Sequence, residues 1–147
     1  MATAIIPNAV LVAEIDRLVN DGMQVTFTPK GNSMLPFIRG ERDTVMLKAP
    51  ENIRKGDIVL AAASASTYVL HRVIDINEDQ LILMGDGNLV GTEKCRMADV
   101  IAVAVKINKG SREIDCNSRS HQNRAYIWRI LKPVRRYLLA IYRRIIL

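Results

Sequence analysis

The chain has 147 residues, 49% of them hydrophobic, which is enough for one domain with a buried core and a short appendage. Its only cysteines, Cys95 and Cys116, form no Cys-x-x-Cys or Cys/His cluster, so a metal site or a disulfide framework is not expected, and no cofactor is expected. The net charge of +6 is uneven: the first 115 residues hold 13 basic and 15 acidic residues, whereas the last 32 hold eight basic and no acidic ones. Attraction to phosphate or anionic lipid is therefore expected only from the C-terminal tail.

No segment of the sequence has the features of a secretory signal or a membrane span. The apolar stretch near the N-terminus is interrupted by Glu14, Asp16 and Arg17, which a signal peptide does not tolerate. No run of about 18 uncharged apolar residues occurs. We therefore expect a protein that is cytoplasmic or peripherally associated with a membrane.

The first part of the chain predicts one helix and one strand. Residues 8–20 place apolar side chains on one helical face, between Pro7 and the stop signal Asp21-Gly22. Residues 23–27 then alternate apolar and polar side chains, which is the period of a half-buried strand.

The middle of the chain predicts a series of short strands. A small hairpin connection is plausible at Ser64-Ala65-Ser66. The stretch at 100–107 is almost continuously apolar and is expected to be a central strand. Several short strands with polar turns between them indicate a mainly β, compact, coiled antiparallel domain. The candidate strands are 44–48, 58–63, 67–76, 81–84 and 100–107.

The composition changes after the last of these strands. Residues 110–123 are polar and charged and are interpreted as a linker, and residues 124–147 predict an amphipathic basic helix that Pro133 could kink. The expected organisation is thus an N-terminal helix (1–22), a β-domain (23–109), the linker and this helix. Its apolar face comprises Ile127, Ile130, Leu131, Val134, Leu138, Ile141 and Ile145, and its basic face includes Arg129, Lys132, Arg135, Arg136 and Arg143.

One turn and one strand carry candidate chemistry. Ser33 lies in Gly31-Asn32-Ser33-Met34-Leu35-Pro36, where a flexible glycine and a rigid proline can hold a hydroxyl outward, although the same residues also make ordinary loops. A serine becomes nucleophilic only when a base accepts its proton. His71, in the middle of the 67–76 strand, is the candidate base, and the alternative is a structural histidine. His121 is most simply a solvated residue of the linker.

A histidine base needs an acid to orient it and to stabilise its charged form. Asp86, in Gly85-Asp86-Gly87-Asn88, is a candidate, although Asp-Gly is also an ordinary hairpin turn. Arg72 should point to the face opposite His71 and could pair with a nearby carboxylate.

The order of four motifs resembles the type I signal peptidase superfamily. These are the Ser33 motif, Lys55-Gly56-Asp57-Ile58-Val59, His71-Arg72-Val73-Ile74 and the Asp86 motif. The resemblance covers residues 22–107 and is greatest to the endoplasmic-reticulum and archaeal branch, which has a histidine where bacterial enzymes and self-cleaving repressors have a lysine.

The resemblance implies a set of roles. Ser33 would be the nucleophile and His71 the general base, and Asp86 would match the first acid of the family's Gly-Asp-x-Asn motif. A further acid about six residues on often serves in that branch; Thr92 occupies this position here, so the neighbouring Glu93 is the alternative acid. Because Gly31 has no hydroxyl, the Ser33 backbone N–H would stabilise the oxyanion. Substrate-binding candidates are Asn32, Met34 and Pro36.

The expected function is a serine endopeptidase that cleaves a signal or leader segment of a precursor protein after small residues. The substrate would bind as an added strand beside those flanking Ser33 and His71. The alternative is a catalytically silent β-fold module held at a membrane or a partner by its basic tail. A self-cleaving repressor is less well supported, since no Ala-Gly or Cys-Gly bond and no DNA-binding domain precede Ser33. A thiol enzyme using Cys95 has no supporting motif.

The tail also allows two interpretations. Its cationic face, aromatic residues and apolar face predict a helix lying on anionic lipid. The alternative is a helix packed on the β-domain or on a partner chain. Nucleic acid binding is not expected, because the wide apolar face would have no role there.

Overall fold

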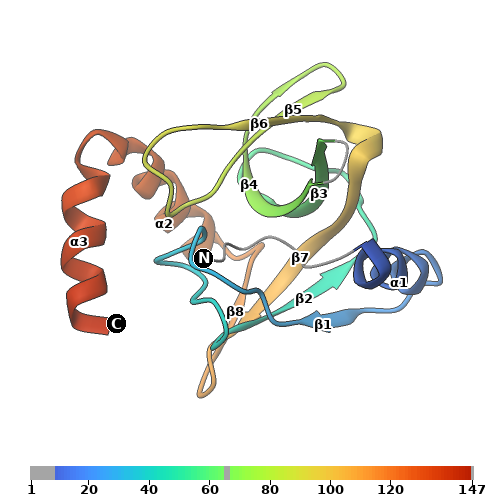
Figure 1. The fold of residues 1–147 in the computed structure, drawn as a ribbon, viewed down its shortest axis with the longest axis horizontal. Coiled ribbons are helices and arrows are strands. Elements are labelled where there is room, and N and C mark those ends of the chain that lie inside the picture. Colours follow the sequence, from blue (N-terminus) through green and yellow to red (C-terminus); the bar gives the residue numbers. More distant parts are fainter. Residues whose placement is uncertain (1–8, 65–66, 147) are drawn as a thin grey trace.

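The computed structural model describes residues 9–64 and 67–146 (Figure 1). In these residues the chain forms a mainly antiparallel β structure with helices at both ends. The strands are β1 (Val25–Phe27), β2 (Thr44–Lys48), β3 (Ile58–Ser64), β4 (Thr67–Asn77), β5 (Gln80–Met84), β6 (Glu93–Arg96), β7 (Val100–Asn108) and β8 (Glu113–Asp115). The α-helices are α1 (Ala9–Asn20), α2 (Arg119–Ile130) and α3 (Arg135–Ile146), and two short 3-10 helices are η1 (Met97–Asp99) and η2 (Lys132–Val134).

The strands form a single curled sheet. Their order is β1-β2-β7-β3-β4-β5-β6, with β8 also paired to β7, and every pairing between described strands is antiparallel. The sheet bends into a half-barrel in which β1 and β6 are the two ends of the order (Figure 1). The mainly antiparallel fold class and the central position of β7 confirm the predictions from the sequence.

Both faces of the middle of the sheet are buried, which explains why β3 and β7 have few polar residues. Ile58 and Leu60 of β3 enter one apolar cluster with α1, whereas Val59 and Ala61 enter a second cluster on the other face. Because successive side chains of a strand point to opposite faces, a strand buried on both sides has a continuous apolar run. Helix α1 covers the first cluster, as its apolar face predicts.

Two strands were not predicted from the sequence. β6 reads Glu-Lys-Cys-Arg and buries only Cys95, so it has no apolar alternation to mark it. β8 lies within residues 110–123, where we expected a linker, and α2 also begins there. Both strands form because a neighbouring strand supplies the backbone partners, which is a tertiary effect that composition does not report. The predicted hairpin turn at residues 65 and 66 lies outside the described residues.

The C-terminal tail is two helices rather than the single helix we expected. Ser118 caps α2 by accepting a hydrogen bond from the His121 N–H. Proline has no N–H and cannot continue the helical hydrogen bonds, so Pro133 lies in η2 and the chain turns there before α3 begins. In Figure 1, α2 lies against the β-domain and α3 forms an outer edge of the molecule. No helix in the described residues is long and apolar enough to cross a membrane.

Candidate active site

The Ser33 turn follows β1 and is fixed by close contacts between backbone segments. Gly40 lies so near Gly31 that a Cβ atom on Gly40 would be 1.7 Å from the Gly31 carbonyl oxygen. The Asn32 side chain accepts a hydrogen bond from the Gly40 N–H at 3.2 Å. Only glycine permits this approach, so Gly40 holds the start of the turn in place.

The Gly85-Asp86-Gly87-Asn88 loop holds the same turn from the other side. The Gly87 N–H donates to the Ser33 carbonyl oxygen at 2.8 Å. A Cβ atom on Gly85 would lie 2.4 Å from that oxygen, 2.8 Å from Asn88 Nδ2 and 3.0 Å from His71 Nε2. A larger side chain at position 85 would therefore push directly on the catalytic candidates. This motif positions the serine turn by packing against it.

Ser33 and His71 are brought together by this packing. The Ser33 Oγ atom lies 3.0 Å from His71 Nε2, and His71 is only 6% exposed in the middle of β4. Sequence reasoning named both residues, and their hydrogen-bond distance is what a serine nucleophile and its base require.

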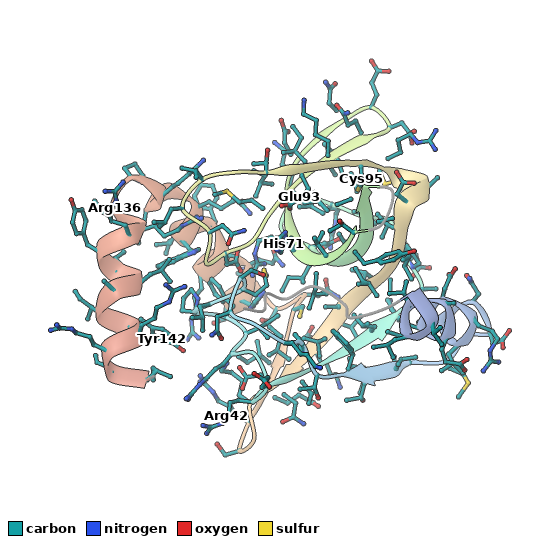
Figure 2. All side chains as sticks on the ribbon, in the orientation of Figure 1. Arg42, His71, Glu93, Cys95, Arg136 and Tyr142 are labelled. Atoms are coloured by element: carbon teal, nitrogen blue, oxygen red, sulfur yellow. The ribbon has the colours of Figure 1, made fainter. Side chains whose placement is uncertain are left out.

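The acid beside His71 is Glu93 and not Asp86. Glu93 Oε1 lies 2.6 Å from His71 Nδ1, and the two side chains lie side by side in Figure 2. An ionised carboxylate only accepts hydrogen bonds, so an ionised Glu93 requires the tautomer in which the His71 Nδ1–H donates a hydrogen bond to Oε1. The His71 Nε2 atom is then free to accept from the Ser33 hydroxyl. The residue that we held only as the alternative acid completes a Ser33–His71–Glu93 arrangement.

The pairing register explains why Glu93 reaches His71. Glu93 of β6 pairs with Leu83 of β5, and Leu83 pairs with Val73 of β4. Directly paired residues point to the same face, and Val73 shares a face with His71 because the two are two residues apart. The sequence signal was weak because β6 itself could not be recognised.

Asp86 instead binds Arg72, which corrects our first choice of acid. Its carboxylate accepts from Arg72 Nε at 2.9 Å and from Arg72 Nη2 at 2.7 Å, and both side chains are buried. Arg72 follows His71 directly in β4, so the two side chains point to opposite faces. A carboxylate that meets Arg72 on its face cannot also meet His71. We had expected Asp86 to orient His71 and had expected Arg72 to pair with some nearby carboxylate. Asp86 is that carboxylate, so it is not the acid of His71.

Helix α2 completes a buried network around Arg72. The Arg72 Nη1 atom donates to the Gly56 carbonyl oxygen at 2.8 Å and lies 3.3 Å from His121 Nε2 of this helix. The guanidinium carbon of Arg72 lies over the Phe37 ring. Trp128 Nε1 donates to the Asp86 carbonyl oxygen at 2.6 Å. His121, expected to be solvated, is therefore part of the buried support beneath the 85–88 loop.

The buried His121 should make folding stability depend on pH. Burial, with a further contribution from the charge of Arg72, lowers the pKa of His121 to about 4 from its usual 6.5, despite the opposing charges of Asp86 and Asp115. Between pH 6.5 and pH 4 the unfolded chain binds more protons than the folded protein. Lowering the pH in this range therefore favours the unfolded state and reduces the free energy of unfolding. We expect the free energy of unfolding to be greatest above pH 6.5 and to fall by on the order of 3 kcal/mol down to pH 4.

Urea unfolding of wild type and His121→Gln at several pH values measures this effect. Glutamine can still accept from Arg72 but does not titrate. The His121→Gln curve should be flatter than wild type between pH 4 and pH 6.5. Parallel curves for the two proteins would show that His121 is not the source.

The residues next to Ser33 do not all have the environments expected of substrate contacts. Met34 is 2% exposed and its sulfur accepts from the Asp86 N–H at 3.4 Å, so its side chain is part of the core. The Asn32 side chain is used within the turn, by Gly40. Pro36 is partly exposed. Met34 is thus a supporting residue, because the turn points Ser33 outward and its next neighbour inward.

Two hydrogen-bond donors lie beside the reacting atoms: the Ser33 N–H, which the sequence analysis named, and the Asn88 side-chain amide, which it did not. The Ser33 N–H was expected to face an oxyanion, and it has no hydrogen-bond partner among the described residues. The partly buried Asn88 also presents its side-chain amide near the reacting atoms, since the Cβ position of Gly85 lies close to both Asn88 Nδ2 and His71 Nε2. That amide makes no hydrogen bond to any described residue. Both donors are available to a bound peptide.

Cys95 has the properties of a core residue. It is 6% exposed, and burial, reinforced by the charge of Asp99, raises the pKa of its thiol to about 11. A thiol with this pKa is protonated at neutral pH and is a poor nucleophile. The interpretation as a thiol enzyme is therefore disfavoured.

Comparison of the chain with protein-family models, with curated proteins and with solved structures gave no match.

Proposed function

We propose that this protein is a serine endopeptidase in which Ser33 is the nucleophile, His71 the general base and Glu93 the acid that orients it. The observation that carries the proposal is the continuous chain of contacts from Ser33 Oγ to His71 Nε2 at 3.0 Å and from His71 Nδ1 to Glu93 at 2.6 Å. A nucleophile, a base and an orienting acid within hydrogen-bond reach are the elements of acyl transfer.

The proposed reaction has two steps. Ser33 Oγ attacks the scissile carbonyl carbon while its proton passes to His71 Nε2, and the Ser33 N–H donates to the resulting oxyanion. The C–N bond breaks as the leaving amine takes the proton from His71, which leaves an ester on Ser33. Water then attacks the ester carbonyl carbon while its proton passes to His71. The C–O bond to Ser33 breaks as His71 returns the proton to Ser33 Oγ, which releases the carboxylic acid product.

The proposed substrate is a signal or leader segment of a precursor protein, cut after a small residue. This part of the proposal comes from the resemblance of the four motifs to type I signal peptidases. It is supported by the two ends of the sheet, as the described strands form it. β1 precedes the Ser33 turn and β6 begins with Glu93, and each is at an end of the strand order. An extended peptide could add to such an edge through its backbone.

A panel of precursor peptides incubated with the intact protein in lipid micelles tests this proposal. We expect cleavage after Ala-like residues, and in acid-quenched samples we expect the amino-terminal fragment to be attached to the peptide that contains Ser33. Cleavage without such an adduct, or after large residues equally well, would contradict the mechanism or the specificity. If no peptide is cut, the alternative of a silent binding module is the better explanation.

A further inference from the structure

Helix α3 carries three kinds of side chain on three sides. One side packs on the β-domain: Leu139 is buried against Leu35 and Trp128, and Tyr142 lies on the flank that faces the rest of the chain (Figure 2). Tyr137 and Ile141 are each two residues from Leu139, about 200° around the helix, and therefore point away from this contact. The outward apolar face consists of Ile127, Ile130, Val134, Tyr137, Ile141 and Ile145.

The outward apolar face is a large exposed surface for a chain of this size. Its six side chains range from 44% exposed for Val134 to 76% for Ile145. They recur at intervals of three or four residues along α2, η2 and α3, which is the spacing of one helical face. Exposed apolar surface of this extent marks an interaction site.

The charged side chains of α2, η2 and α3 are all positive. Arg124, Lys132, Arg136, Arg143 and Arg144 are exposed on the same helices, and no acidic residue occurs after Asp115. Two of the basic residues expected on this surface are used elsewhere. Arg135 is 3% exposed and donates to the Asn88 carbonyl oxygen at 2.9 Å, and Arg129 is partly buried with its guanidinium over Tyr126. The five exposed residues remain available to an anionic partner.

We propose that the outward apolar face and its basic border form a docking surface for an anionic lipid bilayer. The apolar side chains would enter the boundary between headgroups and acyl chains, Tyr137 would lie at headgroup level, and the basic side chains would contact lipid phosphates. A second copy of this chain is disfavoured as the occupant, because it would bring another all-positive tail against the first. This inference does not depend on the proposed peptidase activity.

Co-sedimentation of the full chain with vesicles tests the proposal. We expect binding to vesicles that contain phosphatidylserine, little binding to vesicles of phosphatidylcholine alone, and weaker binding as salt is added. Ile130→Ser/Ile141→Ser/Ile145→Ser should reduce binding at least tenfold, whereas Val10→Ser, which removes an equally exposed apolar side chain from α1, should not. These positions are exposed, so circular dichroism should show unchanged folding.

A second set of variants separates charge at this surface from net charge. Arg136→Gln/Arg143→Gln/Arg144→Gln should weaken vesicle binding by about 100-fold. Lys94→Gln/Arg96→Gln/Lys106→Gln removes the same charge from exposed positions on β6 and β7 and should have a much smaller effect. Equal losses for the two sets, or no binding by wild type, would overturn the proposal. The proposal would also be overturned if the wild type is a dimer and the isoleucine substitutions convert it to a monomer. Ser33→Ala should bind like wild type, so this result is independent of catalysis.

Discussion

Ser33→Ala and His71→Ala are each expected to reduce kcat for peptide cleavage by about 10⁶-fold, because the hydroxyl and its base act as one unit. Without the hydroxyl no ester can form, and without the imidazole the hydroxyl keeps its proton. The double variant should be no less active than either single variant, since the second substitution removes a group that has already lost its function. Steady-state kinetics on the best peptide of the panel would measure all three.

Two controls make this result specific. Ser111→Ala removes an exposed hydroxyl from the turn between β7 and β8 and should leave kcat unchanged. Thermal unfolding should show that Ser33→Ala is folded, because Ser33 is only partly buried. Full activity in folded Ser33→Ala would refute the serine mechanism, and additive losses in the double variant would refute the coupling of the two residues.

The parts of the fold that the sequence predicts well are those with a strong local period. Residues 44–48 were predicted as a strand with the bounds of β2, and the almost continuous apolar run at 100–107 was correctly expected in the interior of the sheet. Residues 93–96 carry three charged side chains, and their strand exists only because β5 provides a partner. Short edge strands of this kind cannot be recognised from local composition.

In the candidate site, too, the residues in locally distinctive motifs were predicted, and those placed by pairing between distant segments were not. The proximity of Ser33 and His71 was expected from motifs in which each residue is locally distinctive. The acid depended on which carboxylate meets which face of β4, and that is fixed by the register of two further strands. The role of α2 was also hidden, because its polar first turn looked like a linker, although His121 and Trp128 of that helix reach the network beneath the 85–88 loop.

Glu93→Gln is expected to reduce kcat by about 10⁴-fold while leaving KM and folding nearly unchanged. The glutamine amide can donate to His71 Nδ1, which would put the imidazole proton on Nε2 and prevent it from accepting the Ser33 proton. The neutral amide also no longer stabilises the imidazolium formed in the reaction. Because the Glu93 side chain is 27% exposed and lies at the sheet edge, its loss should cost little stability. Steady-state kinetics and urea unfolding separate the two effects.

Asp86→Asn is the matched control, because it makes the same acid-to-amide change at the other candidate acid. It leaves the buried Arg72 charge without its counter-ion, and removal of one partner of a buried ion pair costs about 3–5 kcal/mol of unfolding free energy. We therefore expect a large loss of stability at position 86 and a large loss of kcat at position 93. A folded Asp86→Asn protein with a 10⁴-fold lower kcat, beside a Glu93→Gln protein of normal activity, would return the catalytic role to Asp86. The opposite result would establish that the buried Arg72–Asp86 pair supports the site from beneath, while Glu93 acts on His71 from the edge of the sheet.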